Sequence, residues 1–64
     1  MDYKLIPFER ETDANEVAQA LGGVVIEDRG GYPAAAVEKD VDTSYSTFDE
    51  LTNVEQRRVE EAAQ

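Results

Sequence analysis

The 64-residue sequence contains no cysteine, no histidine and no tryptophan, and only six lysine and arginine residues. Without cysteine there is neither a disulfide nor a thiolate metal ligand, and without histidine the commonest transition-metal ligand and the usual proton shuttle near neutral pH are also missing. Nucleophilic pairs of the Ser–His or Cys–His kind are therefore excluded. The fold has to be stabilised by packing.

Long apolar runs are also absent. No stretch is long enough to cross a bilayer, and residues 1–4 do not begin a basic region followed by an apolar one. A chain of this length forms one domain, here residues 1–64, with a small core and no deep cleft. We expect a cytoplasmic, monomeric protein without a membrane partner.

Acidic residues are what the sequence has in excess. Fifteen Asp and Glu residues give a formal net charge of −9, while 41% of the residues are apolar, which is enough to form a core. Phosphate backbones and anionic membranes repel such a protein, so we expect no direct binding to nucleic acid. A basic partner is the natural inference from the charge.

The N-terminal third of the chain predicts a strand and a short helix. Residues 3–8 are rich in aromatic and branched side chains, and Pro7, which cannot donate a ladder hydrogen bond, suits an edge strand. Asp13 and Glu16 have the spacing of a capping box. Apolar residues then recur at helical spacing until Gly22, which supplies a left-handed C-cap.

The remaining segments predict a β-hairpin and a second helix. Residues 23–28 form a β-branched run, two consecutive glycines allow a tight turn, and residues 32–39 provide the partner strand. A second capping-box pattern at residues 47–50 begins an apolar stripe at helical spacing. Thr52 can also cap a separate start, so one continuous helix and a turn followed by a helix both remain open.

This order of elements predicts a small α+β domain with an antiparallel sheet of about three strands and both helices packed on one face of it. Apolar residues within the predicted elements are expected to form the core. They are Leu5, Ile6, Phe8, Val17, Leu21, Val24, Ile26, Val37, Phe48, Leu51 and Val54.

Catalysis and metal binding find little support in the sequence. The serine and threonine hydroxyls lack an adjacent base, and a pair of catalytic carboxylates needs a cleft that raises one pKa. Residues 40–44 begin like a calcium loop, but Tyr45 stands where that loop needs glycine and Leu51 where it needs glutamate. We expect no enzymatic activity, no cofactor and no dedicated metal site.

Two groups of acids stand out, and helix stability explains the placement of only Asp49 and Glu50 among them, because these two lie at a predicted helix start. Glu38, Asp40 and Asp42 alternate, so in an extended chain they lie on one side at intervals of about 6.7 Å. In the second predicted helix, acids share the face opposite the apolar stripe, and the last two lie in the final turn, where each costs about 0.3–1 kcal/mol. These four acids are Asp49, Glu50, Glu60 and Glu61.

Spaced carboxylates on a rigid frame can imitate the phosphates of nucleic acid and occupy the basic groove of a nucleic-acid-binding protein. The candidate residues for such partner binding come from the hairpin region and the predicted second helix. They are Glu27, Asp28, Glu38, Asp40, Asp42, Asp49, Glu50, Glu60 and Glu61.

In size, acidity, lack of cysteine and compact α+β build, the whole chain resembles the small acidic anti-CRISPR proteins of phages that act as DNA mimics. The resemblance implies inhibition of a CRISPR surveillance complex, whose basic channel would be blocked against target DNA. It also implies action in the cytoplasm of the host cell.

Two alternatives come from other features. Residues 24–37 followed by a helix that starts with threonine resemble the hairpin-and-helix core of HicB-type antitoxins, with residues 38–40 in place of that family's Leu-Pro-Gly turn. This resemblance implies binding to a toxin. The excess of Asp and Glu also fits a domain from a salt-loving organism, in which the charge would be an adaptation unrelated to function.

Overall fold

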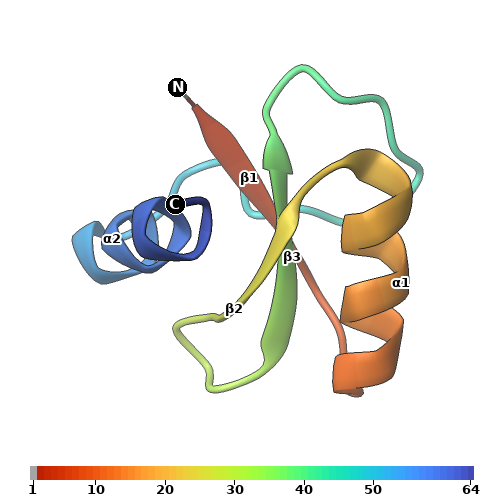
Figure 1. The fold of residues 1–64 in the computed structure, drawn as a ribbon, viewed down its shortest axis with the longest axis horizontal. Helices are drawn as coiled ribbons and strands as arrows, with labels where there is room; N and C mark the ends of the chain where they lie inside the picture. The colour runs from red at the N-terminus through yellow and green to blue at the C-terminus, as the bar shows by residue number, and fades with distance from the viewer. Residues whose placement is uncertain (1) are drawn as a thin grey trace.

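The computed structural model describes residues 2–64 and has a three-stranded antiparallel sheet with a helix on either side (Figure 1). The predicted α+β class, the three strands and the two helices are confirmed. The elements in chain order are β1 (Tyr3–Pro7), α1 (Glu11–Leu21), β2 (Val24–Glu27), β3 (Pro33–Glu38) and α2 (Asn53–Ala62).

The strand order is β1-β3-β2, which places the last strand of the chain in the centre of the sheet. β2 and β3 form the predicted hairpin, with Val24 opposite Ala36, and Ala36 lies between Val24 and Leu5 of β1. Because β1 and β2 are both antiparallel to β3, they run parallel to each other. The chain crosses from one to the other through α1.

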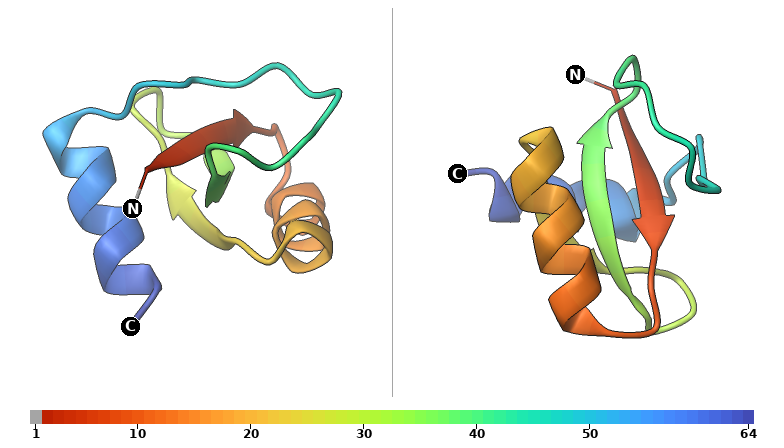
Figure 2. Two further views of the ribbon diagram at one scale, coloured as in Figure 1. Left: turned by 90° about the horizontal axis from the view of Figure 1, so that it is seen from above. Right: turned by 90° about the vertical axis from the view of Figure 1, so that its right-hand side faces the viewer.

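The prediction that both helices pack on one face of the sheet is wrong, because they lie on opposite faces (Figures 1 and 2). Ala36 packs in one cluster with Val59 of α2, whereas its neighbour Ala35 packs in the other cluster with Ala18 of α1. Residues 34–37 have no exposed surface. Four consecutive apolar residues are typical of a strand that is buried on both faces.

The core differs from the prediction. Because the alanine side chains of β3 are small, the backbone of α1 approaches this strand closely. Ala14, Ala18 and Val59 are buried, although none was predicted to be. Phe48 and Val54 were predicted core residues but are 39% and 55% exposed. Phe48 lies before α2, which begins only at Asn53, so it is not part of a helix face packed on the sheet.

The helix boundaries resolve the alternatives that the sequence left open. α2 begins after Thr52, whose side chain accepts a hydrogen bond from the Glu55 N–H in a capping box, so residues 47–50 do not start it. At α1 the N-cap is Arg10 without a side-chain cap, so the predicted capping box of Asp13 and Glu16 is not formed. The predicted left-handed C-cap at Gly22 is confirmed, with φ of 73°.

The expected alternation of Glu38, Asp40 and Asp42 along an extended strand is also wrong. β3 ends at Glu38, and the Val41 N–H donates to the Glu38 carbonyl at 3.0 Å, which closes a turn. The three side chains therefore do not form a row. No helix within residues 2–64 combines the length and the apolar character needed to cross a membrane.

Gly23 is where the start of β2 passes closest to the central strand. A Cβ atom there would lie 2.2 Å from the Ala36 carbonyl oxygen and 2.8 Å from Val37 Cγ1. We expect Gly23→Ala to lower the free energy of unfolding by about 1–3 kcal/mol, since the strand would have to move. Urea denaturation followed by circular dichroism measures this loss.

Gly30→Ala is the matched control. Its added Cβ would meet the flexible Tyr32 ring at 3.3 Å, and Gly30 does not have a positive φ. A loss for Gly30→Ala as large as that for Gly23→Ala would contradict the close approach between β2 and β3.

Candidate protein-binding surface

The turn of the β2–β3 hairpin is closed by Asp28. Its Oδ1 accepts hydrogen bonds from the backbone N–H groups of Gly30 at 2.8 Å and Tyr32 at 3.0 Å. Asp28 is only 4% exposed. Although it was one of the predicted partner-binding residues, its carboxylate is used by the turn and lies outside the exposed acidic surface.

Next to this turn, Arg29 and Glu55 join the hairpin to α2. Glu55 is 1% exposed, and its carboxylate accepts from the Arg29 backbone N–H at 2.7 Å, from Arg29 Nη2 at 2.9 Å and from Arg29 Nε at 3.1 Å. The Thr52 N–H donates to the same carboxylate at 2.8 Å, which completes the capping box. The pairing of Arg29 with Glu55 was not predicted. The spacing of Thr52 and Glu55, which is that of a capping box, was the visible signal that Glu55 has a structural role.

Arg29 also fixes the segment that leads into α2. Its Nη2 donates to the Glu50 carbonyl at 2.8 Å, and its guanidinium carbon lies 4.9 Å from the centre of the Phe48 ring. Phe48 in turn exchanges two backbone hydrogen bonds with Leu5 of β1. Because of these contacts, the backbone that carries Asp49 and Glu50 is held against the sheet.

Burial by itself would raise the pKa of Glu55, because removal from water disfavours the charged carboxylate. The hydrogen bonds from the Thr52 N–H and from Arg29, together with the Arg29 charge, outweigh this effect. The pKa of Glu55 is therefore lower than its ordinary value. A buried carboxylate that stays charged at neutral pH has a structural role here.

Apart from Asp28 and Glu55, every acidic residue is exposed. Five of them gather at one end of the sheet, around two adjoining hollows that share Asp2 and Lys39. We call this group the acidic end. It comprises Asp2, Glu38, Asp40, Asp49 and Glu50.

Two other predicted residues, Glu27 and Glu61, lie at the outer edge of β2. With Arg58 and Ala62 they line a hollow between this strand and α2. Arg58 Nη1 donates to the Glu27 carbonyl at 2.8 Å and lies 3.8 Å from its carboxylate. The remaining predicted residues, Asp42 and Glu60, are exposed but line neither this hollow nor the acidic end.

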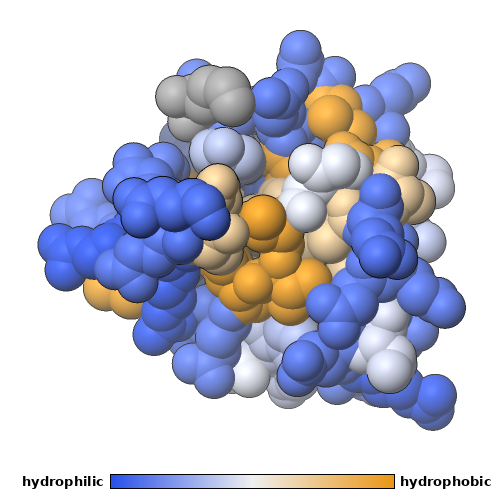
Figure 3. Space-filling model, viewed as in Figure 1, coloured by the Kyte–Doolittle hydropathy of each residue, from blue (hydrophilic) through white to orange (hydrophobic). Residues whose placement is uncertain are grey.

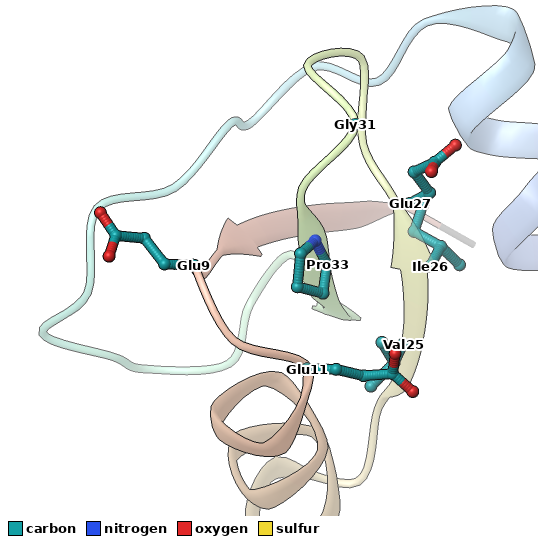
Figure 4. A pocket seen from close by; sticks show the side chains of 7 residues that line it. All are labelled: Glu9, Glu11, Val25, Ile26, Glu27, Gly31 and Pro33. Atoms are coloured by element: carbon teal, nitrogen blue, oxygen red, sulfur yellow. The ribbon is translucent and has the colours of Figure 1, made fainter.

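On the opposite side of β2, toward α1, Glu9 and Glu11 line a further hollow, and Glu27 borders it from β2 with its carboxylate turned toward α2 (Figure 4). Val25 and Pro33 provide apolar lining. Glu9 and Glu11 were not predicted as site residues, because their approach to β2 depends on the way the chain enters α1. No local pattern in the sequence indicates it.

The acids face solvent without converging on one point. Within residues 2–64 no group of three acidic side chains is close enough to hold a metal ion. Comparisons of the chain with protein-family models, with curated proteins and with solved structures found no match. Function therefore has to be inferred from the acidic surface and the frame that carries it.

The lowered pKa of Glu55 gives a pH prediction. Because the folded-state pKa lies below the unfolded one, Glu55 stabilises the fold above about pH 4.3, and this contribution is lost as the pH falls through the folded-state pKa. We expect Glu55→Gln to lower the free energy of unfolding by about 1.5–3 kcal/mol at pH 7, and by progressively less as the pH falls below about 4.3. Urea denaturation of both proteins between pH 3 and pH 7, in steps of about one pH unit, measures the difference.

Glu61→Gln is the control, since this exposed side chain is in the same helix and forms no ion pair among residues 2–64. Its effect should stay within about 0.5 kcal/mol. A difference between wild type and Glu55→Gln that does not change with pH would contradict the proposed role of the charge.

Proposed function

We propose that this protein is a non-catalytic inhibitor whose acidic end occupies the nucleic-acid-binding groove of a basic protein. The observation that carries the proposal is the gathering of five exposed carboxylates around a single cation, Lys39. Such a surface attracts Lys and Arg side chains that otherwise contact phosphates, and it accelerates encounter at low salt.

The backbone that carries these carboxylates is well anchored. The Lys39 N–H donates to the Asp2 carbonyl at 3.0 Å, and Glu38 is the register partner of Tyr3 in the sheet. Asp49 and Glu50 follow Phe48, which bonds to Leu5. Charges at fixed positions lose less conformational freedom on binding than charges on a flexible tail, which favours a specific complex.

The acid groups do not favour a catalytic role. A carboxylate that acts as a general acid near neutral pH needs a raised pKa and access to substrate. Glu55 is buried, paired with Arg29, and has a lowered pKa. Exposed carboxylates spread over a surface instead act together through their electric field.

A CRISPR surveillance complex is the partner that we propose to test first, because it holds target DNA in a channel lined by Lys and Arg and because the chain resembles DNA-mimic inhibitors. The protein is expected to displace labelled target DNA from the guide-loaded complex. Displacement should weaken with rising salt, since exposed charges are screened over about 10 Å at 0.1 M salt.

The test uses the double variant Glu38→Lys with Asp40→Lys. Two reversals at the acidic end replace attraction by repulsion, so the concentration needed to displace half of the DNA should rise at least about tenfold, which corresponds to about 1.4 kcal/mol. Fluorescence anisotropy of the labelled DNA measures displacement. Circular dichroism verifies that the variant is folded.

The double variant Asp13→Lys with Glu16→Lys carries the same change in net charge on exposed positions of α1. It should displace DNA almost as well as the wild type. Equal loss in both variants would show that net charge alone is responsible. Failure of the wild type to displace DNA even at low salt would overturn the proposal for this complex.

A further inference from the structure

The two outer strands of the sheet differ in how their free edges are protected. On β1, Leu5 exchanges hydrogen bonds with Phe48, and Pro7 has no N–H to offer. β2 contains neither proline nor lysine, and no strand formed by residues 2–64 lies on its outer side. An uncovered edge of this kind is a template for another strand, and most proteins protect it.

The backbone hydrogen bonds show which groups on this edge are free. The Asp28 N–H donates to the Tyr32 carbonyl, so Asp28 faces β3, and by alternation Val25 and Glu27 direct their backbone groups outward. Arg58 Nη1 donates a hydrogen bond to the Glu27 carbonyl, which is therefore not free. Within residues 2–64 no group bonds to the N–H or the carbonyl of Val25, or to the N–H of Glu27.

Side-chain surroundings differ on the two sides of this edge. An apolar band runs over β2 between the two helices and is bordered by polar surface (Figure 3). Toward α1 the hollow has a volume of about 490 Å³ and is lined by Glu9 and Glu11, while the carboxylate of Glu27 turns toward Arg58 of α2 (Figure 4). Toward α2 the lining includes Ile26, Ala62 and the cation of Arg58.

We propose that the outer edge of β2 accepts an extended segment of the basic partner as a fourth, antiparallel strand. The inference rests on the proposed function, since it takes the partner to be a basic protein. Main-chain hydrogen bonds to Val25 would supply affinity, and alternate side chains would supply specificity, as in other cases of strand addition.

The alternation of side chains sets the order of residues in that segment. Val25 packs on the α1 face and Ile26 on the α2 face. The segment residues opposite Val25 and Glu27 therefore point to the α1 side, where Glu9 and Glu11 provide the carboxylates, which favours Lys or Arg. The residue between them points toward Ile26 and the Arg58 cation, which favours an apolar side chain. The expected order is basic, apolar, basic.

A second copy of this chain is a poorer occupant. Pairing of β2 with β2 would place a second set of carboxylates next to Glu9, Glu11 and Glu27, and each copy has a net charge of −9. The repulsion between like charges disfavours this arrangement, whereas a basic segment neutralises them.

The probe is a fluorescent peptide with the central sequence Lys-Val-Lys-Val-Lys, flanked by Gly and Ser. In antiparallel pairing the lysine N–H groups face β2 and the valine N–H groups face away. N-methylation of the lysine nitrogens should weaken binding at least about tenfold, and methylation of the valine nitrogens should leave it within about threefold. Fluorescence anisotropy at low salt measures the affinities.

On the protein, Val25→Pro removes the outward N–H without removing a bond to β3, and Val25→Ala keeps that N–H as the matched control. Only the proline variant should lose binding of the unmethylated peptide, and amide shifts of Val25 and Glu27 should report contact in the wild type. If Val25→Pro does not fold, the two methylated peptides still decide the question.

Equal affinity of the two methylated peptides would overturn the proposal, as would unchanged binding by folded Val25→Pro. Dimerisation of the wild type that Val25→Pro abolishes, measured by sedimentation, would overturn it in favour of a second copy. If the Glu38→Lys, Asp40→Lys double variant loses DNA displacement while Val25→Pro retains it fully, the proposed function stands and strand addition is wrong.

Discussion

The pair formed by Arg29 and Glu55 is the interaction on which the arrangement of the C-terminal third depends. Glu55 starts α2 through the capping box with Thr52, and the same carboxylate binds the backbone and the guanidinium of Arg29 at the hairpin turn. Arg29 then reaches Phe48 and the Glu50 carbonyl. One buried carboxylate thus positions a helix, a turn and the backbone of two of the five acids in the acidic end.

The rest of the fold depends little on charge. Alanines at 34–36 in the central strand bring a helix close to each face of the sheet, and the packing of both clusters is apolar. Such a core can offset the repulsion that a net charge of −9 imposes on the compact state. The frame determines where the exposed acids gather, and recognition of a partner is the role that we propose for them.

The sequence predicted those parts of the structure that depend on neighbouring residues. The β2–β3 hairpin and the end of α1 at Gly22 follow from local turn and capping preferences. The two-sided burial of β3 was not predicted, although residues 34–37 form an apolar run, and the central position of this strand depends on contacts with β1 that no local pattern reports.

The same limit applies to the acidic surface. Exposure of the acids at positions 38, 40, 49 and 50 was predictable, whereas their gathering around Lys39 required the fold. Asp28 and Glu55 have ordinary acidic side chains, and only their hydrogen bonds show that they are structural. Arg29 and Glu55 are 26 residues apart, so their pairing could not be inferred from spacing. The most direct test of how much this pair stabilises the fold is a double-mutant cycle on the free energies of unfolding, with Arg29→Met and Glu55→Gln. The structure predicts a coupling energy of about 1–3 kcal/mol, and effects that add within about 0.3–0.5 kcal/mol would contradict it.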